Sequence, residues 1–434
     1  MNLPIMRIGQ LAQLSPELLR SRRGLQTDEN EAIESEARKI VEQVRTRGDA
    51  ALLEFTARFD VVDITGKGLK VSDSDIKQAH AKVSSSEKHA LEFLRDRIAS
   101  VEKRRLRAIR YTYSDRLIRL VQTTRPLDSI GCYVPGGLAV YPSTLLMTVV
   151  PAKIAGVRRI AVFTPPHKGE IDPLTLVAAD ICGVDEVYRV GGAQAIAAMA
   201  YGTQSIAPVQ KIVGPAGRFV TATKMLVSRD VAIDLPAGPS EVLVLADEDS
   251  DPKLVALDII SQAEHSPDSV PIVVSTSPAI IEKIRNFLEL RLPELERRDI
   301  VEKALSECGA LLLANSMEEA LAFVNAFAPE HLQLMVREPD RIAEQVSSAG
   351  IILIGPNTPV AASDYALGTN HVLPTSGYAR TFSGLSVLDY VKCISIVEAQ
   401  ESAISRVRPV VEALSMREGL PNHSRALQGR LNDA

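Results

Sequence analysis

The stretch from residue 130 to residue 163 reads IGCYVPGGLAVYPSTLLMTVVPAKIAGVRRIAVF. It begins with a short apolar run, residues 130–134, which stops at a proline and two glycines. A helix-length segment at 143–155 follows, and a second short apolar run occupies 159–163. Short apolar runs that are bounded by turn residues and separated by helix-length segments are typical of βαβ units. The stretch therefore predicts a parallel sheet covered by helices.

The same alternation continues beyond this stretch through residue 234, and a second set of the same kind occupies residues 242–354. We therefore predict an α/β protein with two tandem Rossmann-like, doubly wound parallel-sheet domains. Their bounds are predicted at 128–236, for a nucleotide-binding domain, and at 237–380, for a catalytic domain. Residues 1–127 are predicted to be mostly helical and to pack on the catalytic domain, and residues 381–434 to form a helical tail.

Composition narrows the class of protein. The 434 residues are 46% hydrophobic but only 4% aromatic, which fits an interior of aliphatic layers. A formal net charge of −5 gives no electrostatic reason to expect nucleic acid. The four cysteines are far apart in sequence and show no CxxC spacing, so we expect reduced cysteines. Without a recognisable signal peptide or an apolar run long enough to span a membrane, a cytoplasmic location is expected.

Glycine- and proline-rich turns follow five of the predicted strands. Ligands of parallel sheets bind at the carboxyl ends of the strands, where helices begin and glycine allows close backbone approach. The turns therefore predict a cleft for an elongated, phosphate-bearing ligand, although glycines also simply end strands. Neither standard glycine-rich nucleotide fingerprint is present. The five turns are at residues 135–137, 191–192, 214–217, 236–240 and 355–356.

The second half of the chain carries the candidate metal ligands. Gln262 and His265 are three residues apart at the end of a predicted helix and can share one of its faces. Asp364 lies in a polar segment with no apolar pattern, and His423 lies in a polar tail. Together the four would form a set of nitrogen and oxygen ligands suited to zinc. Sequence spacing leaves open whether they meet.

Glu330 and His331 are the candidate acid–base pair. They stand at the start of a predicted strand, where both side chains can reach a cleft, and a carboxylate beside an imidazole suits a general base working near neutral pH. A surface glutamate beside a half-buried histidine is the alternative. His371 ends the polar segment that begins at Asp364, which we interpret as a ligand-binding loop.

Seven motifs in the chain resemble the histidinol dehydrogenase family, and the resemblance covers nearly all of the sequence from about residue 30 onward. The motifs are Tyr133-Val-Pro-Gly-Gly137, Val190-Gly-Gly-Ala-Gln-Ala-Ile-Ala-Ala198, Asp234-Leu-Pro-Ala-Gly-Pro-Ser-Glu-Val242, Ser261-Gln-Ala-Glu-His265, Pro329-Glu-His331, Asp364-Tyr-Ala-Leu-Gly-Thr-Asn-His-Val-Leu-Pro-Thr375 and Arg417-Glu-Gly-Leu-Pro-Asn-His423.

The resemblance implies an aldehyde-dehydrogenase-like homodimer that catalyses a four-electron, NAD-dependent oxidation. L-Histidinol becomes L-histidine through L-histidinaldehyde, in the last steps of histidine biosynthesis. The family's zinc ligands fall on Gln262, His265, Asp364 and His423. Its base falls on His331, and its water-activating residue falls on Glu330.

The resemblance also implies contacts with the substrate and the cofactor. Substrate contacts fall on Ser240, His371 and Glu418, in addition to the metal ligands and His331. Dinucleotide contacts fall on Tyr133, Gln194 and Gly217. The family's C-terminal tail enters the partner's site, so Glu418 and His423 are expected to act across a homodimer.

One departure from the family and three alternatives remain. The family commonly has Gly-Pro-Gly-Asn where this chain has Gly214-Pro-Ala-Gly217, so weaker NAD binding is expected. A family relative could oxidise another small amino or sulfonated alcohol instead of histidinol. A zinc hydrolase could use the same side chains with metal-bound water, and it would need no NAD. A non-catalytic two-lobed binding protein would leave the Glu330–His331 pair without a purpose.

Overall fold

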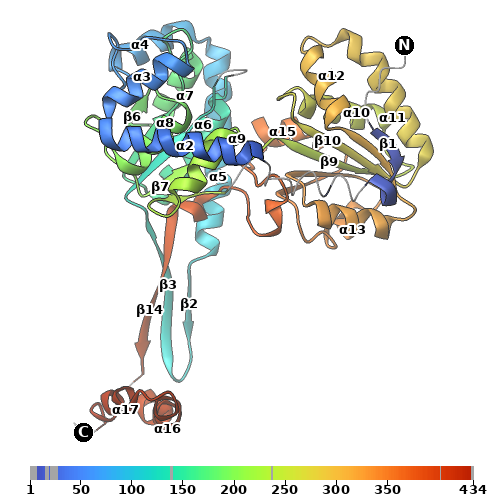
Figure 1. The fold of residues 1–434 in the computed structure, drawn as a ribbon. Coiled ribbons are helices and arrows are strands. Elements are labelled where there is room, and N and C mark those ends of the chain that lie inside the picture. Colours follow the sequence, from blue (N-terminus) through green and yellow to red (C-terminus); the bar gives the residue numbers. More distant parts are fainter. Residues whose placement is uncertain are drawn as a thin grey trace.

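The computed structural model describes residues 7–14, 19, 28–136, 140–235, 238–400 and 402–431. Two α/β lobes are joined to a long β-ribbon, and the ribbon ends at a pair of C-terminal helices (Figure 1). Each lobe contains a parallel sheet, so the predicted α/β fold with two parallel-sheet domains is confirmed. The predicted junction at 236–237 lies outside the described residues.

The first lobe contains a five-stranded parallel sheet in the order β6-β5-β4-β7-β8. Its strands are β4 (Ser129–Tyr133), β5 (Arg159–Phe163), β6 (Glu186–Tyr188), β7 (Lys211–Val213) and β8 (Ala232–Ile233). Its helices are α6 (Pro142–Ala155), α7 (Pro173–Ile181), α8 (Gly192–Tyr201) and α9 (Arg218–Val227). Helices α6 and α8 are apolar almost all round, which is typical of helices buried between other elements.

The second lobe contains a six-stranded parallel sheet in the order β1-β11-β10-β9-β12-β13. Its strands are β1 (Arg7–Gln10), β9 (Glu241–Ala246), β10 (Val270–Ser275), β11 (Ala310–Leu313), β12 (His331–Met335) and β13 (Ile351–Ile354). Its helical elements are α10 (Pro252–Ala263), α11 (Pro278–Arg291), η1 (Leu292–Glu294), α12 (Arg298–Glu307), α13 (Met317–Phe327), α14 (Pro339–Ala343) and α15 (Val360–Tyr365). Strand β9 is buried along its whole length, as a central strand covered on both faces should be.

The N-terminal helices pack on the first lobe, so the prediction that they pack on the catalytic domain was wrong. Helix α2 contacts α8 and α9, α4 contacts α7, and α5 contacts α6. The physical reason is a shared core: Ile40 and Val44 of α2 join one buried cluster with the apolar side of α8. Among the described residues of this region, only those of β1 join the second sheet. The helices are α2 (Asp28–Arg47), α3 (Asp49–Phe59), α4 (Asp73–Lys82) and α5 (Ser85–Ala108).

The ribbon is a three-stranded antiparallel sheet that the sequence did not predict. It consists of β2 (Tyr111–Ser114), β3 (Ile118–Pro126) and β14 (Val391–Ala399), with β3 in the middle. All but the first residue of β14 are exposed, although its sequence, VKCISIVEA, contains several of the β-branched residues that are typical of strands. The predicted helical tail is therefore partly strand. Short helices η2 (Tyr378–Arg380) and η3 (Val387–Tyr390) precede β14, and α16 (Ala403–Arg417) and α17 (Pro421–Gln428) follow it.

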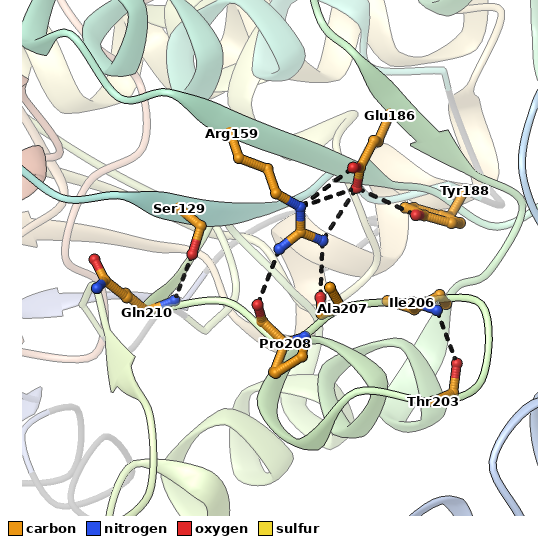
Figure 2. Close-up of polar contacts among 9 residues, drawn as sticks. All are labelled: Ser129, Arg159, Glu186, Tyr188, Thr203, Ile206, Ala207, Pro208 and Gln210. Atoms are coloured by element: carbon orange, nitrogen blue, oxygen red, sulfur yellow. Dashed lines mark hydrogen bonds and ion pairs between the residues drawn. The ribbon is translucent and has the colours of Figure 1, made fainter.

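The amino ends of the first sheet's strands are joined by an internal hydrogen-bond network (Figure 2). Arg159 at the start of β5 donates to the carboxylate of Glu186 at the start of β6, with Nη2···Oε2 at 3.1 Å. The same guanidinium donates to the carbonyl groups of Ala207 and Pro208, at 2.8 and 2.9 Å. The network ties the loop before β7 to the sheet.

Candidate active site

The candidate catalytic side chains gather at the amino ends of the second sheet's strands. Glu330 immediately precedes β12, His331 begins it, and Ser240 immediately precedes β9. We expected ligand-binding residues after the strands, whereas these three candidates stand at or just before the starts of strands. Helices α10 and α15 run back to the amino edge and carry Gln262 and Asp364 in their last turns. The edge therefore collects side chains from helix ends as well as from strand starts.

The main chain of Glu241 holds the Glu330–His331 pair. Both side chains are buried, with 6% and 3% of their residue surfaces exposed. The Glu241 N–H donates to Glu330 Oε2 at 2.7 Å, and His331 Nδ1 lies 3.1 Å from the Glu241 carbonyl oxygen. Because a carbonyl oxygen only accepts, Nδ1 carries the proton of this hydrogen bond. His331 Nε2 is thereby directed toward Asp364 Oδ1, 3.5 Å away.

Glu241 is a candidate positioning residue that the sequence analysis missed. Its carboxylate accepts a hydrogen bond from the backbone of Glu330 at 3.3 Å and another from the backbone of Ser376 at 2.9 Å. Ser376 has a positive φ of 53°, which is unusual for a residue with a side chain. Glu241 thus joins β9, β12 and a strained turn. The available signal was a carboxylate at the head of an otherwise apolar strand.

Opposite shifts in pKa accompany the approach of His331 and Asp364. Burial alone would lower the pKa of His331, but the carboxylates of Glu330 and Asp364 raise it well above its usual value. Burial would raise the pKa of Asp364, but the neighbouring His331, with further effects of His371 and His265, lowers it. The opposite directions reflect the close approach of the His331 ring to the Asp364 carboxylate in a buried environment.

The residues at this edge fit a metal ion. Buried polar atoms nearly always have a hydrogen-bond partner, yet three here have none among the described residues: Gln262 Oε1, His331 Nε2 and Asp364 Oδ1. Helix α10 packs against α15, and the half-buried His265 stands two residues beyond the end of α10. Carboxylate, amide and imidazole groups are ligands for zinc. The carboxyl-terminal ends of both helices also favour a cation.

The fourth predicted ligand is not brought to this edge. His423 is exposed on α17, which lies at the far end of the ribbon beside α16 (Figure 1). Glu418, the residue after α16, is exposed there too. Within the described ranges, no three His, Cys, Asp or Glu side chains converge into a metal-binding group. One chain by itself therefore supplies an incomplete set of the predicted ligands.

The carboxyl edge of the first sheet has the features of an anion-binding surface. The Gly192 N–H donates to the Tyr133 hydroxyl at 3.2 Å. Gln194, in the first turn of α8, is 1% exposed, and neither of its amide atoms has a partner in the part of the chain that the structure describes. Gly217 is the exposed N-cap of α9, where a Cβ would meet no atom within 4 Å. Two helix amino ends and an unpaired buried amide fit a dinucleotide.

The match to a known family decides what this arrangement is. The family model described as histidinol dehydrogenase matches residues 23–431. The chain belongs to the histidinol dehydrogenase family. It is therefore a dehydrogenase, and the resemblance noted in the motifs is confirmed.

Individual histidinol dehydrogenases agree with this membership. That of Methanothermobacter thermautotrophicus is 44% identical over 395 residues, covering 91% of this chain and 92% of its own. That of Bacillus anthracis is 44% identical over 403 residues, covering 93% and 94%. The crystal structure of the histidinol dehydrogenase from Elizabethkingia anophelis superposes with a TM-score of 0.92 at 34% identity, covering 99% of this chain and 98% of that one.

In this member of the family, His371 joins the two lobes. Its Nε2 lies 3.1 Å from the Thr144 hydroxyl at the start of α6, and its Nδ1 lies 3.2 Å from the Asp364 carbonyl oxygen. Because the Asp364 carbonyl oxygen can only accept, Nδ1–H donates to it. In the neutral ring, Nε2 then accepts a hydrogen bond from the Thr144 hydroxyl. Both ring nitrogens are thus engaged within the protein. Burial lowers the pKa of His371, which favours this neutral form.

No helix in the described ranges is both long enough and apolar enough to span a membrane.

Proposed function

We propose that this dehydrogenase oxidises L-histidinol to L-histidine in two NAD-dependent steps at the amino edge of the second sheet, as the last steps of histidine biosynthesis. The observation that carries the proposal is the buried Glu330–His331 pair, whose Nε2 faces Asp364 beside the unpaired Gln262. The pair supplies a base for each step, and family membership supplies the class of reaction. A reducing, cytoplasmic location belongs to the same proposal.

His331 acts in the first step. Its Nδ1 proton is committed to the Glu241 carbonyl oxygen, so Nε2 accepts the proton of the substrate hydroxyl. The carbon-bound hydrogen leaves as hydride for NAD, and the alcohol becomes an aldehyde. The buried, hydrogen-bonded imidazole is held by β12 rather than by a loop, which keeps Nε2 in one orientation.

Glu330 acts in the second step. One carboxylate oxygen, Oε2, accepts the Glu241 N–H, and the carboxylate accepts a proton from water as the water adds to the aldehyde carbon. A second hydride then leaves for a second NAD, and the product is the carboxylate. The two steps together consume one water and two NAD for each histidinol.

Gln262, His265 and Asp364 would hold zinc in the second lobe. Zinc would supply a Lewis-acid centre that binds the amino and imidazole nitrogens of the substrate. Gln262 and Asp364 are well placed for this because each has a buried oxygen without a partner among the described residues. Ser240, half-buried directly before β9, and His371 would bound the same substrate site.

A second copy of the chain would complete the site through its tail. The ribbon exposes apolar side chains, as does α16, and a second copy would bury them. They are Tyr111, Tyr113, Ile394, Ile396, Val397, Val410 and Leu414. In such a homodimer Glu418 and His423 of one chain would reach the substrate and the metal of the other. A chain truncated at residue 400 lacks Glu418 and His423 and is then expected to bind zinc more weakly than the full-length chain.

The cofactor would bind at the carboxyl edge of the first sheet, against Tyr133, Gln194 and Gly217. Gly217 offers no side-chain hydrogen bond there, so we expect NAD to bind less tightly than in relatives with asparagine at this position. A fluorescence titration with NADH measures this affinity. An affinity equal to that of such relatives would remove this part of the proposal.

The decisive experiment counts reduced cofactors on metal-analysed protein. With zinc bound, each histidinol consumed is expected to yield two NADH. One NADH per substrate, or faster turnover of another amino or sulfonated alcohol, would contradict the proposal and favour a relative with a different substrate.

A further inference from the structure

Gly214 directly follows β7, and it lies beside Tyr133, the last residue of the neighbouring parallel strand β4. Its φ is +119°, and a Cβ at this position would lie 2.1 Å from the carbonyl oxygen of Tyr133. Such a contact cannot be relieved by moving a side chain, because the obstacle is backbone. Glycine is therefore required at the first position of the turn 214–217, which leads into α9.

A buried ion pair, Lys224 and Asp234, forms hydrogen bonds with both the backbone N–H and the carbonyl group of Gly214. Asp234 Oδ2 accepts the Gly214 N–H at 2.7 Å. Lys224 Nζ donates to the Gly214 carbonyl oxygen at 2.8 Å and also to Asp234 Oδ1. The two side chains are 2% and 0% exposed. Lys224 lies in α9 and Asp234 follows β8. Their hydrogen bonds to Gly214 therefore connect α9 and β8 to the end of β7.

Stability alone is a poor explanation for this pair. Removing two charges from water costs several kcal/mol for each ion, and apolar side chains of similar size often serve a core equally well. What apolar side chains could not do is hold the N–H and the C=O of one glycine in fixed directions. The pair is therefore better explained by the geometry that it imposes on the turn.

We propose that Lys224 and Asp234 are positioning residues for the cofactor. They fix the turn 214–217 in the free protein, so that the first turn of α9 is ready to receive the phosphate groups of a dinucleotide. The proposal rests on the proposed use of NAD. Because the turn is already ordered before the cofactor binds, binding does not lose conformational entropy in ordering it, and the affinity is higher.

The test compares this pair with a second ion pair of the same sheet. The full-length variants Asp234→Asn and Lys224→Met are titrated with NADH by fluorescence, beside the matched variants Glu186→Gln and Arg159→Met from the amino edge. The Asp234→Asn and Lys224→Met variants are expected to bind NADH about 10- to 100-fold more weakly. The amino-edge variants are expected to lose thermal stability but to keep the wild-type NADH affinity. Histidinol binding to the zinc-loaded protein is expected to change less than twofold in all four.

Wild-type protein gives a second measurement that does not depend on any variant folding. Hydrogen exchange at the Gly214 amide is expected to be slow without NADH and to change little when NADH is added. An amide that becomes protected only with NADH would overturn the proposal, as would unchanged NADH affinity in a folded Asp234→Asn or Lys224→Met protein. A wild-type protein that binds no NADH would instead overturn the proposed use of NAD, and this role with it.

Discussion

The two lobes share one architecture but carry their candidate sites at opposite edges of their sheets. In the first lobe, α8 and α9 begin at the carboxyl edge, so their positive ends and glycine turns face outward. In the second lobe, α10 and α15 end at the amino edge, so their negative ends meet Gln262 and Asp364. Helix polarity suits the first edge to phosphate and the second to a cation. One fold thus supplies two kinds of electrostatic environment by reversing which edge is used.

The amino edge of the first sheet refines this comparison. It is the same kind of edge as the one that holds His331, yet Arg159 and Glu186 satisfy each other and the loop carbonyls around them (Figure 2). The edges differ in whether buried polar atoms are left without partners. Substitutions should therefore cost function at the second lobe's amino edge and stability at the first lobe's.

The largest expected effect is that of His331→Asn. Losing the base is expected to lower kcat about 1,000-fold for both histidinol and the aldehyde, because proton transfer to Nε2 serves the reaction directly. Thermal stability should stay close to wild type, since Nε2 has no hydrogen-bond partner among the described residues. Steady-state kinetics and calorimetry measure the two quantities. A variant that keeps its activity but unfolds at a lower temperature would show that His331 is a structural residue and not the base.

Glu330→Gln is expected to separate the two oxidations. The amide still accepts the Glu241 N–H, so the fold of the edge is kept, but it cannot accept a proton from water. Oxidation of the aldehyde should fall about 100-fold and oxidation of the alcohol far less. Single-turnover measurements starting from each substrate test this division. Equal losses in both steps would show that Glu330 has no separate role.

Gln262→Leu tests the metal side of the comparison. The leucine has nearly the same volume and removes an oxygen that has no partner in the described part of the chain. Zinc affinity is expected to fall about 10- to 100-fold, while thermal stability without metal stays the same or rises. Competition with a chelating dye measures the affinity. A large loss of stability in the metal-free protein would mean that Gln262 is a structural residue.

Arg159→Met should give the opposite pattern. It removes hydrogen bonds to Glu186 and to two carbonyl groups, and we expect a loss of about 2 kcal/mol in unfolding free energy with unchanged KM and kcat. Denaturant titration beside kinetics checks both. A changed KM for NAD would show that this edge communicates with the cofactor edge.

The smallest expected effect is the pH dependence of that loss. Burial would raise the pKa of Glu186, but Arg159 lowers it below its usual 4.5. A carboxylate with a depressed pKa contributes stability above its unfolded pKa and loses that contribution as pH falls through the folded value. The stability difference between wild type and Arg159→Met should therefore be full at pH 7 and shrink below pH 4.5. A difference that grows in acid would contradict the pairing.

Periodicity was sufficient to predict both parallel sheets, because strands buried on both faces form apolar runs that stand out from the helices between them. It could not predict the ribbon, since β14 is exposed and carries no pattern of burial. It also could not tell on which lobe α2 would pack, since an apolar helix face does not specify its partner. Such choices depend on contacts between distant parts of the chain.

The candidate site was predicted only in part, for a similar reason. The residue types at 262, 330, 331 and 364 pointed to acid–base and metal chemistry. The sequence placed Glu330 and His331 at the start of a strand. It could not place Gln262 and Asp364 at the same edge, because α10 and α15 had to fold back first. Glu241 was missed because its role is to hold other residues through backbone hydrogen bonds, which no motif displays.

The ribbon carries His423 away from the lobes of its own chain (Figure 1). Under the proposed tail exchange, each active site takes its lobe from one chain and its tail from the other chain. A chain with His331→Asn and a chain with His423→Ala would each be inactive alone. In a mixed dimer, the intact lobe of the second chain would meet the intact tail of the first and restore one working site. Two defective alleles in one cell should therefore complement each other, with about a quarter of all sites active when chains pair at random.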